Sequence, residues 1–298
     1  MRNHRVPTLA ALLVPVALGA VVALAPGPAL SAPAAHAAGL SRAAAGPTGA
    51  VAGPTGVADA GAPVTARGPG PVERLYGSEN RTFPTTRREV ALTFNAAWDE
   101  AGLADVLRTL DRNGAPATFF PTGRFAERHP DAVRAMARRH GVGSHSHTHP
   151  HFSRLTRTEV EEEVTAADRA LRAAGAVPLP FFRFPYGETT PQTIAHVNSL
   201  GLADIEWTTD TKGYLGTPGG MTVQQAVKRV ADVLRPGAII QMHIGSADGS
   251  GEVLDAEALP QIIDLVRARG YEVVDLRGLT GEAVAPDQAQ PVGRTSAP

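Results

Sequence analysis

The chain has 298 residues, no cysteine, a formal net charge of −1 and a hydrophobic fraction of 43%. This length and composition allow a substantial core in one large domain or two small ones. The near balance of charges argues against binding to nucleic acid or to an anionic lipid surface. The lack of cysteine excludes disulfides and lipid-modified cysteines, so stability must come from the core.

Residues 1–37 have the pattern of a secretory signal peptide. Arg2 and Arg5 precede an apolar run that starts near Leu9, and an A-x-A cleavage site ends at Ala37. The alternative is a transmembrane anchor, but proline and glycine interrupt the run and no stop-transfer charges follow it. We therefore expect a secreted protein, extracellular or associated with the cell wall, without a stable membrane anchor.

Composition divides the rest of the chain into three parts. Residues 38–86 are rich in Ala, Gly and Pro, and we expect a flexible linker because such a segment buries too little apolar surface to offset its ordering entropy. The tail, residues 281–298, is again rich in Pro and Ala and is expected to be disordered. The folded domain is therefore predicted over residues 87–280.

Within that domain, short apolar runs alternate with helical patterns. Strands are predicted at residues 90–94, 117–120, 141–144, 180–184, 203–207, 238–242 and 272–276. Helices are predicted at residues 100–113, 130–140, 157–174, 190–200, 222–234 and 256–269. The third helix is the clearest, because Thr156 and Glu159 form a capping box before one apolar stripe. The alternation predicts an α/β fold with a parallel sheet, either open or closed into a barrel.

Polar side chains follow several of the predicted strands. They are Asn95 and Asp99 after the first strand, His145 and His149 after the third, Arg183 after the fourth, Asp210 after the fifth and His243 after the sixth. The carboxyl ends of parallel strands share one rim, where α/β proteins build active sites. The sequence therefore predicts one functional site that collects residues from five loops.

The run from His145 to His151 holds four of the ten histidines. Neutral imidazoles bind zinc and similar ions, and the spacing of His145 and His149 suits a shared ion. The alternative is a solvated polar loop without function. We expect the other two histidines, His147 and His151, to be solvated or to support the site from outside, or His147 to contact a sugar.

The ordered motifs resemble those of the polysaccharide deacetylase family, also called NodB-type. The matching segments are 92–95 (Leu-Thr-Phe-Asn), 117–123 (Ala-Thr-Phe-Phe-Pro-Thr-Gly), 145–150 (His-Ser-His-Thr-His-Pro), 183–187 (Arg-Phe-Pro-Tyr-Gly), 210–211 (Asp-Thr) and 242–243 (Met-His). The resemblance implies a distorted (β/α) barrel of about seven parallel strands. It also implies metal-dependent removal of acetyl groups from a carbohydrate such as chitin oligomers, peptidoglycan or xylan.

The resemblance assigns roles to individual residues. It implies that His145 and His149 bind a divalent metal, most simply zinc, and that His243 protonates the leaving group. Chemistry suggests further that Arg183 holds a carboxylate, that Asp210 orients His243, and that the Tyr186 N–H stabilises an oxyanion. The alternatives are structural: Arg183 ties loops together, His243 is a satisfied buried imidazole, and Asp210 caps a turn.

The first motif departs from the family pattern. Members of the family usually have Thr-Phe-Asp-Asp-Gly, with a general base and a metal ligand, where this chain has Thr-Phe-Asn-Ala-Ala with Asn95 and Ala96. An amide does not accept a proton at neutral pH, and alanine does not bind metal. We therefore expect Asp99 to fold back as the third ligand or as the base.

Two functional classes remain open at this point. The first is a secreted, metal-dependent carbohydrate deacetylase that acts on a cell-wall or chitin-like polysaccharide. The second is a catalytically inactive barrel that binds cell-wall glycan, as the loss of both carboxylates suggests. Hydrolysis of another amide is a weaker third option. A carboxylate that joins the histidine pair on a metal would favour the first class.

Overall fold

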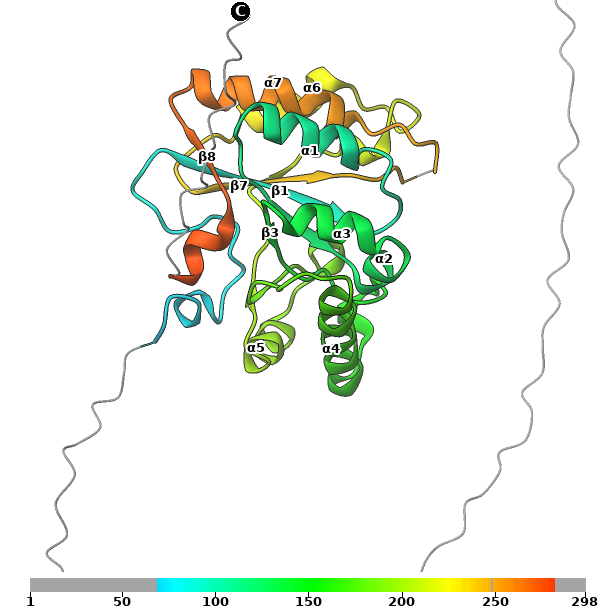
Figure 1. Cartoon of the computed structure of the whole chain (residues 1–298). Helices are drawn as coiled ribbons and strands as arrows, with labels where there is room; N and C mark the ends of the chain where they lie inside the picture. Colours follow the sequence, from blue (N-terminus) through cyan, green and yellow to red (C-terminus); the bar gives the residue numbers. More distant parts are fainter. Residues whose placement is uncertain (1–68, 248, 282–298) are drawn as a thin grey trace, which may run out of the picture. The chain divides into compact units, whose positions relative to one another are not determined.

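The computed structural model describes residues 69–247 and 249–281, and the predicted parallel α/β fold is confirmed (Figure 1). Eight strands occur in this part of the chain: β1 (Glu89–Ala96), β2 (Thr118–Pro121), β3 (Gly141–Val142), β4 (Phe181–Phe182), β5 (Ala203–Asp204), β6 (Thr209–Asp210), β7 (Ala238–His243) and β8 (Glu272–Val274). All the pairings between these strands are parallel. The sheet therefore has the single carboxyl-end rim that the sequence predicts.

Most of the strands belong to one sheet with the order β3-β2-β1-β7-β6, and β8 pairs with the start of β1. A second sheet consists of β4 and β5. Two isolated bridges connect its edges to the rest: Ser144 to Phe182 beside β3, and Asn80 to Ile205. The strands therefore curve into a distorted barrel whose wall is partly irregular.

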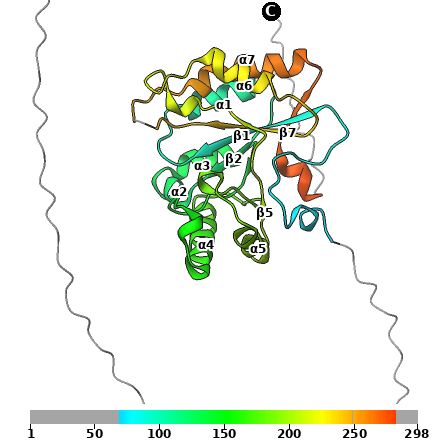
Figure 2. The same ribbon diagram turned by 180° about the vertical axis from the view of Figure 1, so that it is seen from behind.

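Helices surround this barrel. They are α1 (Leu103–Arg112), α2 (Gly123–Arg128), α3 (Pro130–Ala137), α4 (Arg157–Ala173), α5 (Pro191–Ser199), α6 (Val223–Ala231) and α7 (Leu254–Ala268). Figures 1 and 2 show α1, α6 and α7 together on one side of β1 and β7, and α2 to α5 on the other side of the molecule. The capping box predicted before the third helix is present at Thr156 and Glu159 and begins α4.

The core follows from the alternation of side chains along the strands. Val90, Leu92 and Phe94 of β1 pack in a large apolar cluster with α1, α3, α6 and α7. Ala91 points the other way, into an interior cluster with Phe120, Phe181, Ile205, Ile239 and Leu276. Apolar side chains thus fill most of the inward positions away from the rim, and Thr118 at the start of β2 is a buried polar exception whose hydroxyl accepts the Leu276 N–H.

Three details differ from the sequence prediction. Residues 69–86, which we expected to be linker, belong to the fold: a short helix at Glu73–Leu75 buries Leu75, and Phe83 is buried where its N–H bonds to Gly237. The two-residue strand β6 and the six-residue helix α2 were not predicted. Both are too short to have a periodic pattern, and α2 is marked only by Thr122, which caps it.

The predicted signal peptide, the linker up to residue 68 and the tail from residue 282 lie outside the described residues. In the part of the chain that the structure describes, no helix is both long and apolar enough to cross a membrane.

Candidate functional site

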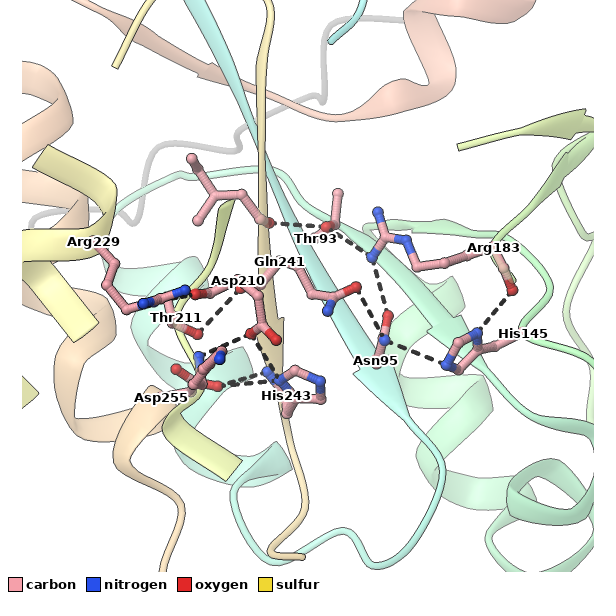
Figure 3. Close-up of polar contacts among 12 residues, drawn as sticks. Thr93, Asn95, His145, Arg183, Asp210, Thr211, Arg229, Gln241, His243 and Asp255 are labelled. Atoms are coloured by element: carbon pink, nitrogen blue, oxygen red, sulfur yellow. Dashed lines mark hydrogen bonds and ion pairs between the residues drawn. The ribbon is translucent and has the colours of Figure 1, made fainter. Parts of the chain in front are cut away.

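The predicted rim residues meet at the carboxyl ends of the strands. Asn95 of β1 and His243 of β7 are register partners on neighbouring strands, and Asp210 of β6 lies opposite Gln241 of β7. His145 and Arg183 come from the segments that follow β3 and β4. Figure 3 shows two polar groups side by side, one around Asn95 and the other around His243.

Asn95 lies at the centre of the first group. Its side-chain Oδ1 accepts a hydrogen bond from Nη1 of Arg183 at 3.0 Å, and its Nδ2 donates to Oε1 of Gln241 at 3.2 Å. The same Nδ2 lies 3.3 Å from Nε2 of His145 (Figure 3). The buried amide of β1 is thereby connected to β7 and to the segments that follow β3 and β4.

The two histidines of the predicted metal pair do face each other. The ring centroids of His145 and His149 are 4.8 Å apart in an edge-on arrangement. Burial lowers the pKa of His149 to about 4, and burial together with the neighbouring His149 lowers the pKa of His145 well below its usual value. Both imidazoles are therefore neutral at physiological pH, which is the form that binds metal.

The loop that carries this pair is strained and is held from one helix. Ser146 and His149 both have a left-handed backbone, with φ near +64° and +62°, which non-glycine residues adopt at a cost. The carboxylate of Glu163 on α4 accepts hydrogen bonds from the N–H groups of His147 and Thr148 and from the Thr148 hydroxyl. This single side chain stabilises the turn between the two imidazoles.

We expect Glu163→Ala to lower the free energy of unfolding by about 2 kcal/mol, because a charged acceptor of three hydrogen bonds is lost. In a domain of this size that corresponds to a fall in melting temperature of roughly 5 °C, measured by circular dichroism. Glu161→Ala on the exposed face of the same helix is the control and should leave the melting temperature nearly unchanged. Equal melting temperatures for both variants would contradict the assignment.

Arg183 lies inside the barrel mouth and is fully buried, at 0% exposure. Its Nε donates to the Ile205 carbonyl and its Nη2 to the Glu206 carbonyl, while Nη1 serves both Thr93 and Asn95. The guanidinium also stacks on the Phe120 ring at 4.1 Å. Burial lowers its pKa to about 10, still high enough to keep the charge. Arg183 thus holds an amide where we expected a carboxylate, and it ties loops together as well.

His243 forms the second group with two carboxylates. Its Nδ1 lies 3.5 Å from Oδ2 of Asp255 and 3.8 Å from Oδ1 of Asp210 (Figure 3). The same Asp255 oxygen accepts the backbone N–H of His243 at 2.8 Å, so Asp255 fixes the main chain of His243 and places a carboxylate beside its ring. Asp210 also caps a turn by accepting the Lys212 N–H, so both roles considered for it are compatible with its position.

Aromatic rings surround the rim. Trp98 lies between three of them, with ring centroids 6.4 Å from His149, 6.4 Å from His243 and 5.8 Å from Tyr214. On the other side of His149, Tyr186 packs edge-on at 4.6 Å and stacks with His151 at 4.2 Å. Tyr186 and Trp98 are 55% and 39% exposed, which is unusual for large rings. Two accessible ring faces therefore flank the histidine pair.

Asp99 is not where we expected it. Its carboxylate accepts hydrogen bonds from the Ala101 N–H and from the N–H and hydroxyl of Ser246, and it stabilises that loop. The chain bends at Ala97 and Trp98 after the end of β1, and this bend leaves Trp98 at the rim and Asp99 against Ser246. The third ligand predicted for the histidine pair is therefore not supplied by Asp99 in this structure.

The residues at the pair do not fit a zinc ion of the catalytic type. Such ions take three protein ligands and keep one open position. Across residues 69–247 and 249–281, no three His, Cys, Asp or Glu side chains come together as a metal site. The group nearest the pair from β1 is the Asn95 amide, whose N–H faces the ring nitrogen of His145.

Other functional residues were missed by the sequence prediction. Asp255 reads as an ordinary acid in the first turn of a helix, Glu163 as one of three consecutive surface acids, and Gln241 as the polar position of a strand. The one available signal was Gln241, because a polar residue inside a continuous apolar strand is unusual for a parallel sheet.

His147 packs against Gly123, where a Cβ would lie 2.2 Å from its Nδ1, and points away from the pair.

Comparisons with known proteins agree with this geometry. A family model for polysaccharide deacetylase matches residues 83–205. A chitooligosaccharide deacetylase of Bradyrhizobium sp. (strain ANU 289) is 34% identical over 212 residues, which cover 68% of this chain and 93% of that protein. A family 4 carbohydrate esterase of Streptomyces lividans, solved with acetate, superposes with a TM-score of 0.57 at 30% identity and covers 67% of this chain and 98% of that one.

A CE4 family pseudoenzyme of Bacillus anthracis superposes with a TM-score of 0.58 at 27% identity, covering 65% of this chain and 66% of that one. A mutant of that pseudoenzyme has restored enzymatic activity. The barrel and its rim thus define a protein of the carbohydrate deacetylase class. The chain belongs to the polysaccharide deacetylase family.

Proposed function

We propose that this chain is a secreted glycan-binding member of the family, which holds an N-acetylated polysaccharide at the rim without hydrolysing it at a useful rate. One observation carries the proposal: the amide of Asn95 occupies the position from which a carboxylate would act beside His145. Amide hydrolysis needs a base for the attacking water, and an amide side chain has no such basicity.

The glycan class follows from the aromatic rings. Exposed Trp98 and Tyr186 present flat apolar faces on both sides of His149, and sugar rings stack on such faces. Few other aromatic side chains are available, at 5% of the chain, so the binding site is short. Relatives named for chitooligosaccharide and for peptidoglycan N-acetylglucosamine support a chitin-like or peptidoglycan ligand.

Binding is tested with N-acetylated chitin oligomers and peptidoglycan fragments by isothermal titration calorimetry. Trp98→Ala and Tyr186→Ala are each expected to weaken binding about fivefold to tenfold, since a stacked ring contributes about 1 kcal/mol or slightly more. Tyr271→Ala, at the amino end of β8, is the control and should retain the affinity. Unchanged affinity in both rim variants would contradict a glycan site here.

Turnover is tested by acetate release from the same ligands, with and without added zinc. The unaltered chain is expected to release acetate at the background rate in both conditions. Asn95→Asp restores a carboxylate at the rim, and its acetate release is compared with that of the unaltered chain. Zinc-stimulated acetate release by the unaltered chain would refute binding without turnover.

Hydrolysis by the unaltered chain is the second candidate, and one observation favours it. His243 lies between Asp210 and Asp255, an arrangement that suits an acid for a leaving amine and has no obvious use in a purely binding protein. In that case a divalent metal, zinc first, would be the cofactor, and its remaining ligands would have to come from substrate or solvent. Loss of acetate release in His243→Ala would support this candidate.

A further inference from the structure

The orientation of the Asn95 amide is fixed by its neighbours. A guanidinium only donates hydrogen bonds, so the Asn95 atom 3.0 Å from Nη1 of Arg183 must be the carbonyl oxygen. The NH₂ group then points to the side-chain oxygen Oε1 of Gln241 and to Nε2 of His145. A flipped amide would bring its NH₂ against the guanidinium inside a buried site, where two facing donors are unfavourable.

The tautomer of His145 is fixed in the same way. Its Nδ1 lies 2.8 Å from the Arg183 carbonyl oxygen, which only accepts, so Nδ1 carries the hydrogen. In the neutral ring the lone pair is then on Nε2, and the group that faces Nε2 is the NH₂ of Asn95 at 3.3 Å. Nε2 is also the one nitrogen through which this ring could bind a metal ion.

From these two facts we propose that Asn95 acts as an internal plug: its amide N–H occupies the metal-binding lone pair of His145 and keeps divalent metal out of the histidine pair. This inference deepens the proposed binding function and rests on it, because it gives the physical reason for the lack of turnover. The site is closed by a group of the chain itself, in addition to being short of a ligand.

Arg183 and Gln241 hold the plug in place, because both contact the amide directly. Thr93 accepts a second hydrogen bond from Nη1 of Arg183 at 3.0 Å and does not contact the amide. Arg183 directly follows β4 and Gln241 belongs to β7, and both side chains are buried, so the amide has little freedom to swing aside. A metal ion would have to displace a hydrogen bond and reorganise this group before it reached Nε2.

A plug that blocks Nε2 and a site that merely lacks a metal ligand predict different zinc affinities for Asn95→Ala. If only a ligand is missing, alanine adds none and zinc affinity stays as it is. If the amide blocks Nε2, alanine frees the lone pair, and zinc should bind about threefold to tenfold more tightly, the equivalent of one hydrogen bond. Asn95→Asp removes the block and adds a carboxylate, so its affinity should exceed that of the alanine variant.

The experiment is a titration of the full chain with zinc by calorimetry and with cobalt(II) by visible absorption, for the unaltered protein and the variants Asn95→Ala, Asn95→Asp and Thr93→Val. Thr93→Val is the matched control, because it removes another acceptor of Arg183 and leaves the contact between the amide and His145. It should bind zinc no more tightly than the unaltered chain. Equal affinities for the unaltered chain and Asn95→Ala would overturn the proposal.

A second measurement avoids any dependence on the folding of variants. In the unaltered chain with ¹⁵N-labelled histidine, NMR should show His145 as the Nδ1–H tautomer, with an Nε2 signal that stoichiometric zinc does not shift. A zinc-induced shift of that signal would overturn the plug. Neither readout uses acetate or glycan, so failure of the plug and failure of the glycan-binding proposal give different results.

Discussion

Replacing Arg183 with methionine is expected to lower the free energy of unfolding by about 4 kcal/mol, which corresponds to a melting temperature lower by roughly 10 °C. Methionine fills much of the volume beside Phe120 but donates no hydrogen bonds. The carbonyls of Ile205 and Glu206 and the side-chain oxygens of Thr93 and Asn95 then lose their donor in a buried site. Each unsatisfied acceptor costs about 1 kcal/mol or more.

Two further variants give this prediction its controls. Arg183→Lys keeps the charge but not the planar fork, so it should lie between the methionine variant and the unaltered chain. Arg172→Met removes an exposed arginine that pairs with Asp168 one helical turn away, worth about 0.4 kcal/mol. Urea unfolding of the three variants measures the differences. A methionine variant at position 183 as stable as the one at position 172 would contradict the assignment.

The fold was largely predictable from the sequence because its signals are local. A β/α alternation, an apolar β1 and a capping box before α4 each follow from residues close together in the chain. The parallel strands then put Asn95, His145, Arg183 and His243 on one rim without knowledge of any contact. β6 escaped prediction because two residues have no period, and its pairing to β7 depends on a strand distant in the sequence.

The interior of the site was predictable only in part, because hydrogen-bond direction depends on which groups meet in space. Asn95 was recognised as an altered residue, but its bond to His145 needs the register of β1 against its neighbours. Nearness in the sequence predicts Asp99 at the histidine pair, whereas local turn geometry directs its carboxylate to Ser246. No sequence pattern links Asp255 to His243. The two residues meet only because α7 begins at the rim.

A pair of buried carboxylates beside Arg183 also escaped the sequence prediction. Asp204 and Glu206 are both fully buried, and the Asp204 oxygens have no hydrogen-bond partner among the described residues. Burial, and then the charge of Glu206, raise the pKa of Asp204 to about 10, and burial also raises the pKa of Glu206. Asp204 is therefore protonated in the folded protein at neutral pH.

We expect Asp204→Asn to stabilise the protein above neutral pH. The folded chain holds a proton on Asp204 that the unfolded chain, with a pKa of about 3.9, releases. The stability that this proton provides is complete below about pH 4 and is lost as the pH rises toward the folded pKa of about 10. Asparagine has nearly the same shape and does not titrate, so the variant should gain about 5 kcal/mol over the unaltered chain between pH 5 and pH 9, because each pH unit between the two pKa values changes the stability by about 1.4 kcal/mol.

Urea unfolding at pH 5, 7 and 9 measures this difference, with Asp168→Asn on the exposed face of α4 as the control. The control should follow the unaltered chain at every pH, because Asp168 is partly exposed and makes only a weak surface pair with Arg172. Parallel stability curves for Asp204→Asn and the unaltered chain would mean that Asp204 is ionised in the fold. Its negative charge would then compensate Arg183, and the methionine variant at position 183 should in that case lose more stability as the pH rises.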